Sequence, residues 1–445
     1  MTKESLPEPD SEKELRSRIA AGLASLDEYL ELARLVYLTG RYPEAVTWYQ
    51  TILGLPQPLL HRARVCQEFG QMHFDMNDQA QASRLAEEAL GILSQESECP
   101  EVWARRGVSQ TLIAYCEWSS DQQAGARIAQ LALENLDRAI GENSGFQDRP
   151  LALLNTATLH GFLGNSERAI TFVEQALQYD LHGWQRLCCV ALYGESLLTT
   201  GRFSEAQRQL QIAIDLARPY KTLLPILYRH LALTERLLTP SRERQQLRKA
   251  QFTCHEALAA LAADPYRHVK SELNRDINMN LAWVCYELEE FPAAATAFEE
   301  ALEDMPKGDP SYSQAQLWLG GCYQNMATYA TAQLCYKNVL TSSCASDEQK
   351  LDAKLGLAHG QFALGNKKGA MVSFQELVTS YPEHDPRRFN VILWIGHCHG
   401  NLGNYTEAQN FYEEVMVSPH ASKADKLSAR QALDQLSPAS KRIFH

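Results

Sequence analysis

The chain has 445 residues, of which 45% are hydrophobic and 22% are charged, and its formal net charge at pH 7 is -12. Phosphate backbones are bound by basic surfaces, so nucleic acid is not expected as the main partner of so acidic a chain. No window approaches the roughly eighteen uninterrupted apolar residues of a membrane span. The polar start has no apolar signal segment. Neither secretion nor membrane insertion is therefore expected.

The first 25 residues predict a disordered leader followed by a capping helix. Residues 1–10 contain two prolines and several acidic residues, a composition typical of disorder. Leu15, Ile19 and Leu23 then recur at helical spacing, which predicts an amphipathic helix. Such a helix would cover the first apolar face of the elements that follow it.

One pattern then recurs along most of the chain. A glycine follows an apolar-periodic run, an alanine stands five positions after the glycine, and a large apolar residue stands nine positions after it. The glycines of the five clearest copies are Gly40, Gly164, Gly201, Gly365 and Gly403. A glycine suits the left-handed position at a helix end, and the small alanine lets two helices approach closely. Each copy therefore predicts a helix, a tight turn and a second helix.

Weaker copies fill the gaps, with Glu289 and Ala327 at the place of the turn glycine. Equivalent first-helix starts fall near residues 26, 63, 100, 150, 187, 225, 275, 313, 351 and 389. Most steps are thus about 37 or 38 residues and two are about 50, which is typical of helical repeat arrays.

These repeats resemble the tetratricopeptide repeat family. Gly107, Gly320 and Gly396 match its small residue early in the first helix, and Pro306 and Pro382 match its closing proline. The resemblance covers roughly residues 26 to 420. It implies an all-α fold, a right-handed superhelical solenoid of about ten helix-turn-helix repeats with capping helices at both ends. In this family the first helices line the concave side, and the members share a scaffold rather than one function.

The two longer steps predict how the array is divided. We expect residues 26–149 and 150–274 to be two blocks of three repeats, each with an elongated third repeat, and residues 275–420 to hold four more. A duplication or two independent insertions would both give this spacing. Residues 421–445 are expected to form a C-terminal capping helix and tail, with an apolar stripe of Ala429, Ala432, Leu433 and Leu436.

No reaction chemistry is expected. The sequence contains no nucleotide-binding loop, hydrolase motif or metalloprotease motif, so we assign no catalytic residue and no cofactor. His397, Cys398 and His399 are adjacent, but neighbouring residues on a helix point about 100° apart, so they cannot converge on one metal. The eleven cysteines lie mostly in apolar helical runs, which favours reduced core thiols and a cytoplasmic location.

Residues at equivalent positions of the last four repeats predict a binding groove. One row of first-helix positions reads Trp283, Gly321, His359, His397; the next reads Tyr286, Gln324, Phe362, Gly400; the third reads Glu287, Asn325, Ala363, Asn401. A core row would be aliphatic throughout, whereas these rows mix rings, amides and glycines that would leave space. The predicted peptide-binding residues are Trp283, Tyr286, Gln324, Asn325, His359, Phe362, His397 and Asn401. The alternative is that Trp283 and Phe362 are buried against neighbouring helices and that His359 is a satisfied hydrogen-bonder.

The favoured function is a non-catalytic adaptor that holds a protein or peptide. Residues 271–420 contain 19 acidic and 9 basic residues, so a basic partner is favoured. The alternative is a self-associating scaffold, a homo-oligomer or part of a multiprotein complex, that makes contact through the elongated third and sixth hairpins. Some family members bind a carboxylate with Lys and Asn at the places held here by Leu30, Arg34, Gln67 and Gln71. Those side chains do not fit that role.

Overall fold

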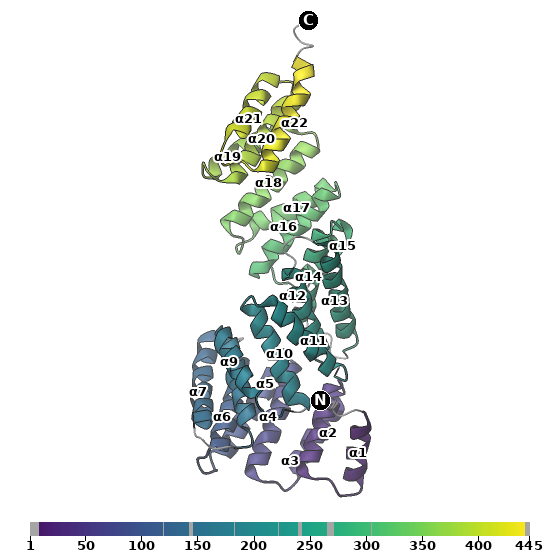
Figure 1. The fold of residues 1–445 in the computed structure, drawn as a ribbon, viewed down its shortest axis with the longest axis vertical. Coiled ribbons are helices and arrows are strands. Elements are labelled where there is room, and N and C mark those ends of the chain that lie inside the picture. Colours follow the sequence, from purple (N-terminus) through teal and green to yellow (C-terminus); the bar gives the residue numbers. More distant parts are fainter. Residues whose placement is uncertain are drawn as a thin grey trace. The chain divides into compact units, whose positions relative to one another are not determined.

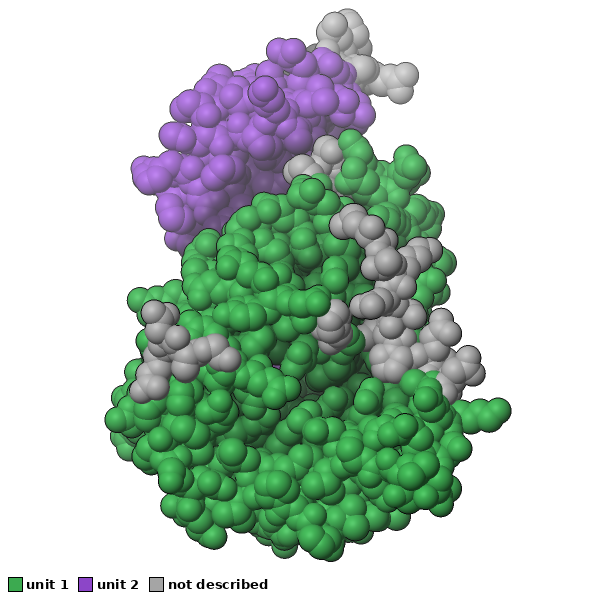
Figure 2. All heavy atoms as spheres, turned by 60° about the horizontal axis from the view of Figure 1, so that its bottom comes forward, with its two compact units in different colours: residues 1–280 green, residues 281–445 purple. Residues whose placement is uncertain are grey.

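The chain folds into helices alone over the part that the computed structural model describes, which is residues 9–118, 120–141, 146–181, 183–220, 222–238, 243–264, 271–303 and 305–440. These residues form 22 α-helices and no strand. None of these helices is long and apolar enough to cross a membrane. Two compact units are present, residues 1–280 and 281–445 (Figure 2).

Unit 1 begins with a single helix and continues with six hairpins (Figure 1). The helices are α1 Pro9–Ala20, α2 Leu26–Leu38, α3 Tyr42–Gly54, α4 Leu59–Asp75, α5 Gln79–Leu93, α6 Pro100–Trp118, α7 Gln122–Gly141, α8 Arg149–Phe162, α9 Ser166–Ala176, α10 Gly183–Thr199, α11 Phe203–Ala217, α12 Leu224–Leu237 and α13 Arg244–Ala262. Helix α14, Ser271–Glu287, runs across the boundary between the units.

Unit 2 completes that hairpin and adds three more before a last single helix. Its helices are α15 Phe291–Glu303, α16 Pro310–Asn325, α17 Tyr329–Thr341, α18 Asp347–Ala363, α19 Lys367–Ser380, α20 Pro386–Asn401, α21 Tyr405–Val417 and α22 Lys423–Ser440. Ten hairpins therefore lie between two terminal helices. The predicted all-α solenoid of about ten repeats with capping helices is confirmed.

The repeated alanine sits where the two helices of a repeat are closest. All five alanines of the clear copies are fully buried: Ala45, Ala169, Ala206, Ala370 and Ala408. The large residue four positions later is buried as well, for example Tyr49 and Phe374. Close backbone approach with a filled interior is what these two residue types allow together.

The turn between the helices of a repeat is left-handed. Gly40, Gly164, Gly201, Gly365 and Gly403 have φ angles between 77° and 91°. The weaker copies keep this geometry without glycine, because Asn77, Glu289 and Ala327 have φ angles of 61°, 63° and 58°. The packing of the hairpin therefore imposes a left-handed turn even where the residue at the turn is not glycine and this conformation is unfavourable for it.

Both terminal helices cover the array as expected, with one exception. Leu15 of α1 is part of the core of the first hairpin, and Ala429 of α22 is buried against α20 and α21. Leu23 was expected on the same stripe as Leu15, which is wrong, because α1 ends before it and Leu23 is 69% exposed. Gly22 has a φ of 69° and redirects the chain there. The predicted leader and tail lie partly outside the described residues.

Unit 1 is more than a linear stack. One continuous core joins α2 and α3 to residues far along the chain, among them Leu187, Leu210 and Leu227. The hydroxyl of Thr222 donates to the carbonyl of Leu38 at 3.3 Å. Burial raises the pKa of the Cys188 thiol on α10, and the charge of Arg34 on α2 also acts on it. The first repeat therefore packs against the fifth and sixth.

The two longer repeats differ from each other. In the third repeat both helices are long, with 19 residues in α6 and 20 in α7. In the sixth, the first helix is not extended, since α12 has 14 residues and the additional length lies in α13, with 19. The division of unit 1 at residues 149 and 150 stays a prediction.

The turns offer a direct test of backbone strain. Ala327→Gly should raise the free energy of unfolding by about 0.5–1 kcal/mol. It removes the cost of a left-handed alanine, about 1–2 kcal/mol, but the greater conformational entropy of glycine in the unfolded chain offsets part of this gain. The reciprocal change Gly365→Ala should lower stability by about 1 kcal/mol. Thermal unfolding followed by circular dichroism would check both, and a loss of stability in Ala327→Gly would contradict the explanation.

Candidate binding surfaces of the two units

Trp283 and Tyr286, the first two predicted groove residues, contact Trp318, which is not in the predicted rows. The rings of Trp283 and Tyr286 on α14 lie 4.3 and 4.8 Å from that of Trp318 on α16. All three side chains are half-buried. The structure thus brings Trp283 and Tyr286 together and adds Trp318 between them.

A second tryptophan organises the other end of the rows. Trp394 on α20 lies 4.6 Å from His359, 5.2 Å from Phe362 and 5.2 Å from His397, measured between ring centroids. Trp318 and Trp394 are two repeats apart in the sequence. Trp318, Gly356 and Trp394 occupy equivalent positions of three successive repeats. This row lies next to the aliphatic core row, and the rows that predicted the groove do not include it.

Gln324 and His397 are held from behind by tyrosines of the second helices. The Tyr336 hydroxyl donates to Oε1 of Gln324 at 3.0 Å, and the Tyr412 hydroxyl lies 2.9 Å from Nδ1 of His397. Both tyrosine rings are buried. These contacts fix the orientation of the amide and of the imidazole.

The two predicted asparagines are the exposed members of the set. Nδ2 of Asn325 donates to the carbonyl of Gly321, and Nδ2 of Asn401 donates to that of His397, each at 2.9 Å. Their carbonyl oxygens face outward with no hydrogen bond in the described residues. Each asparagine therefore offers an acceptor from a fixed side chain.

The glycines of the rows do not leave the open space that we expected. A Cβ on Gly321 would already lie 3.6 Å from the Tyr286 hydroxyl, and one on Gly400 would lie 3.6 Å from the Tyr412 hydroxyl. Neighbouring aromatic side chains therefore fill this space. The surface is shallower than the predicted groove, and peptide binding by its residues stays a prediction.

Most of these residues lie in uncharged stretches, since the segments 311–336, 355–366 and 389–406 contain no Asp, Glu, Lys or Arg. A cation does reach the surface, because Nζ of Lys367 lies 3.5 Å from the centroid of the Phe362 ring, and Glu287 follows Tyr286 on α14. We call the surface formed by Trp283, Tyr286, Trp318, Gln324, Asn325, His359, Phe362, Trp394, His397 and Asn401 the aromatic band. Other acidic side chains, among them Glu299, Glu300, Glu413 and Glu414, are exposed on the second helices.

His359 is the buried titratable group of the aromatic band. Its Nε2 is buried without a hydrogen-bond partner among the described residues. Burial lowers the pKa of His359 to about 4, and it also lowers the pKa of His397. Both imidazoles are therefore neutral at pH 7. The alternative that His359 is a satisfied hydrogen-bonder does not hold for this nitrogen.

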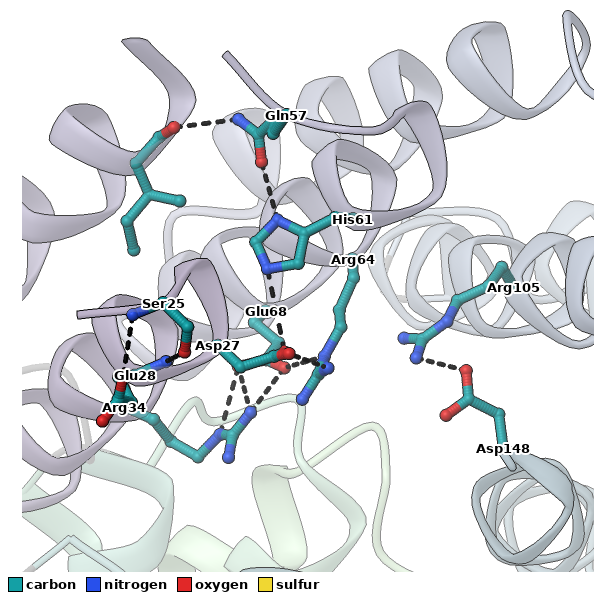
Figure 3. A network of polar contacts seen from close by, with 11 residues as sticks. Ser25, Asp27, Glu28, Arg34, Gln57, His61, Arg64, Glu68, Arg105 and Asp148 are labelled. Carbon is teal, nitrogen blue, oxygen red and sulfur yellow. Dashed lines mark hydrogen bonds and ion pairs between the residues drawn. The ribbon is translucent and has the colours of Figure 1, made fainter. Parts of the chain in front are cut away.

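Unit 1 presents a different, strongly ionic inner surface (Figure 3). Arg34 of α2 donates to Glu68 of α4 from two nitrogens at 3.1 and 2.7 Å. Arg64 lies 3.2 Å from Glu68 and 3.0 Å from Asp27. Burial would raise the pKa of Glu68, but the two arginines outweigh it and lower that pKa. The first helices of the first two repeats are thus linked by paired charges.

This network of polar contacts continues into the third and fourth repeats. Nε2 of Gln67 donates to the carbonyl of Arg105 at 2.7 Å and to the Ser109 hydroxyl at 2.8 Å. Arg105 of α6 pairs with Asp148 before α8 at 2.5 Å (Figure 3). Arg34 and Gln67, which stand where some family members bind a carboxylate, are therefore already occupied by side chains of this chain.

The neutral state of His359 predicts a pH effect. The unfolded chain binds a proton on this histidine near pH 6.5, but the folded chain does so only near pH 4. The free energy of unfolding of unit 2 should therefore fall as the pH drops through this window, by up to about 3 kcal/mol from this residue.

Urea unfolding from pH 7 to pH 4.5 would measure the effect. His359→Phe keeps a ring at this position and should lose this part of the pH dependence, while the exposed His384→Phe should keep it. Equal slopes for the wild type and His359→Phe would contradict the assignment.

Comparison with known proteins matches the second half of the chain to one family. Three tetratricopeptide repeat models match residues 255–325, 352–384 and 390–416. No curated protein matches the chain significantly. Among the described residues, no group of three or more His, Cys, Asp or Glu is placed to hold a metal ion.

Several solved structures match the chain at low sequence identity. The apo form of RapI is 12% identical, with a TM-score of 0.51 over 84% of this chain and 98% of that chain. A human IFIT1 dimer solved with PPP-AAAA is 15% identical, with a TM-score of 0.44 over 92% and 95%. A thermophilic tetratricopeptide repeat protein of Thermus thermophilus is 17% identical, with a TM-score of 0.33 over 47% and 98%. The family matches, the ten hairpins and the left-handed turns together identify tetratricopeptide repeats in this chain.

Proposed function

We propose that the protein is a non-catalytic adaptor that binds a segment of another protein along the aromatic band of unit 2. Tetratricopeptide repeats form a scaffold for protein interactions, and no catalytic family matches this chain. The observation that carries the proposal is the aromatic band itself, where Trp318 and Trp394 contact the predicted rings and the side chains of Asn325 and Asn401 are exposed. Such a mixture of rings and fixed polar atoms is typical of protein-binding surfaces.

The band defines the chemistry of the segment. Half-buried indoles accept apolar side chains, and the asparagine carbonyls accept backbone N–H groups of an extended chain. A charged side chain would lose water against the rings of the band, so we expect the residues that contact these rings to be uncharged.

The acidic second helices act at longer range. Residues 271–420 carry a net charge of -10, and the exposed Glu299, Glu300, Glu413 and Glu414 contribute to it. We propose that these charges favour a partner whose uncharged segment is flanked by basic residues. Salt should then slow association while leaving dissociation nearly unchanged.

Adding charge and bulk to the band should remove binding without disturbing the core. Asn325→Arg with Asn401→Arg places two guanidinium groups on exposed positions, so the fold should be retained and captured partners should be lost. Affinity capture from lysate followed by mass spectrometry would compare this variant with the wild type. For a captured partner, surface plasmon resonance should show at least a tenfold faster dissociation.

A matched control separates the band from the general acidic surface. Asn410→Arg changes an exposed asparagine on the second helix α21 in the same way. It should keep the partner and its dissociation rate. Loss of the partner in the control alone, or unchanged capture by the double variant, would place binding elsewhere on the protein.

Self-association is the second candidate, and one observation favours it. Each elongated hairpin exposes a large apolar residue on its second helix, Leu131 at 50% on α7 and Phe252 at 64% on α13. In this candidate, these two exposed apolar side chains form the contact between copies.

Light scattering coupled to size-exclusion chromatography would test this candidate over a hundredfold range of concentration. If the hairpins hold copies together, the mass should exceed that of a monomer and should fall to 50.1 kDa in Leu131→Glu with Phe252→Glu. A constant monomer mass in the wild type would rule the candidate out.

We also propose a reducing, cytoplasmic location. All eleven cysteines are free thiols, and eight of them are buried. Burial raises the pKa of thiols such as Cys66 and Cys189 to about 12, so they remain protonated and unreactive. This supports their use as small core residues.

A further inference from the structure

A hollow of about 410 Å³ lies in unit 1 between α7, α8 and α9. Asp137 of α7, His160 of α8 and Arg168 of α9 bring three titratable groups to it. Leu133, Leu163 and Phe172 provide an apolar wall. The hollow therefore combines opposite charges with a surface that could accept an apolar side chain.

The two charged groups of the hollow are not used by the fold. Asp137 and Arg168 are exposed, and neither makes an ion pair or a side-chain hydrogen bond within the described part of the chain. Burial raises the pKa of Asp137, and the charges of His160 and Arg168 act in the opposite direction. The carboxylate and the guanidinium thus line the same hollow, and each keeps its bonding capacity.

His160 forms the floor between these charges. Its side chain is only 7% exposed, and its ring stacks on that of Phe172 with centroids 5.4 Å apart and planes 13° apart. Nδ1 is buried without a partner among the described residues. Burial lowers the pKa of His160, and Arg168 lowers it further, so the ring is neutral at pH 7. A neutral floor between a cation and an anion suits a ligand with both charges.

We propose that this hollow binds a small zwitterion of the α-amino acid class. The ligand carboxylate pairs with Arg168, its ammonium group pairs with Asp137, and its apolar side chain packs on Leu133 and Phe172. Charge-assisted bonds at both ends would satisfy two groups that the protein leaves unpaired. The size of the hollow admits an amino acid with a medium or large side chain.

The choice of a zwitterion follows from the balance of charge. A simple anion would meet Asp137 at the same site as Arg168, and a simple cation would meet Arg168, so either would gain one pair and suffer one repulsion. A neutral apolar molecule would leave both charges unpaired. Only a ligand with separated opposite charges gains at both ends.

Isothermal titration calorimetry with L-leucine, L-phenylalanine and L-methionine tests the proposal on the full chain. At least one should bind, and Arg168→Gln and Asp137→Asn should each weaken it at least tenfold. Arg127→Gln, the same change at an exposed position of α7 outside the hollow, should bind as the wild type does. Circular dichroism should show equal helicity in all variants, because each altered side chain is exposed.

Blocked ligands assign each end of the amino acid to its residue. L-leucinamide lacks the carboxylate and is a cation, so Arg168→Gln should not weaken its binding and should strengthen it by removing a like charge. N-acetyl-L-leucine lacks the ammonium group and is an anion, so Asp137→Asn should likewise strengthen its binding. Absence of binding by all three amino acids at millimolar concentration, or binding that both variants retain, would overturn the proposal. Neither result would bear on the function proposed for unit 2.

Discussion

The close approach of two helices at a buried alanine is the interaction on which the whole array depends. At Ala45, Ala206 and Ala370 the side chain is small enough for the helices of one hairpin to touch, and the large residue one turn later fills the space that remains. This geometry fixes the turn, because only a left-handed residue brings the second helix back against the first. Ala327 and Glu289 accept that conformation although it is unfavourable for them. Packing thus dominates local backbone preference in this fold.

The same scaffold presents two chemically different inner surfaces. In unit 1 the first helices are joined by ion pairs such as that between Arg34 and Glu68, and these charges satisfy one another. In unit 2 the corresponding helices carry rings and amides, with Trp318 and Trp394 two repeats apart. A surface whose charges are already paired has little to offer a partner, whereas uncharged rings with fixed acceptors do. This contrast explains why we assign partner binding to unit 2.

The sequence was sufficient to predict the hairpins, because glycine, alanine and a large apolar residue recur at fixed spacing and each has a local effect. It predicted eight residues of the aromatic band but not the ring contacts among them. These contacts run through Trp318 and Trp394, which are absent from the predicted rows. The open space expected at Gly321 was wrong because Tyr286 from the preceding repeat enters it. The packing of the first repeat on the fifth could not be predicted. It depends on the curvature accumulated over several repeats, and no single residue pattern encodes that.

That long-range core has a consequence for cooperativity. In a linear solenoid each repeat contacts only its neighbours, so the ends fray and partly folded forms are populated. In unit 1 the first hairpin is anchored by Leu187, Leu210 and Leu227, which belong to repeats far along the chain. Opening either end of this unit must therefore expose the shared core, and amide hydrogen exchange should protect its early helices as strongly as its middle ones. Because of this shared core, unit 1 should unfold cooperatively as one body, which a linear array of the same repeats would not do.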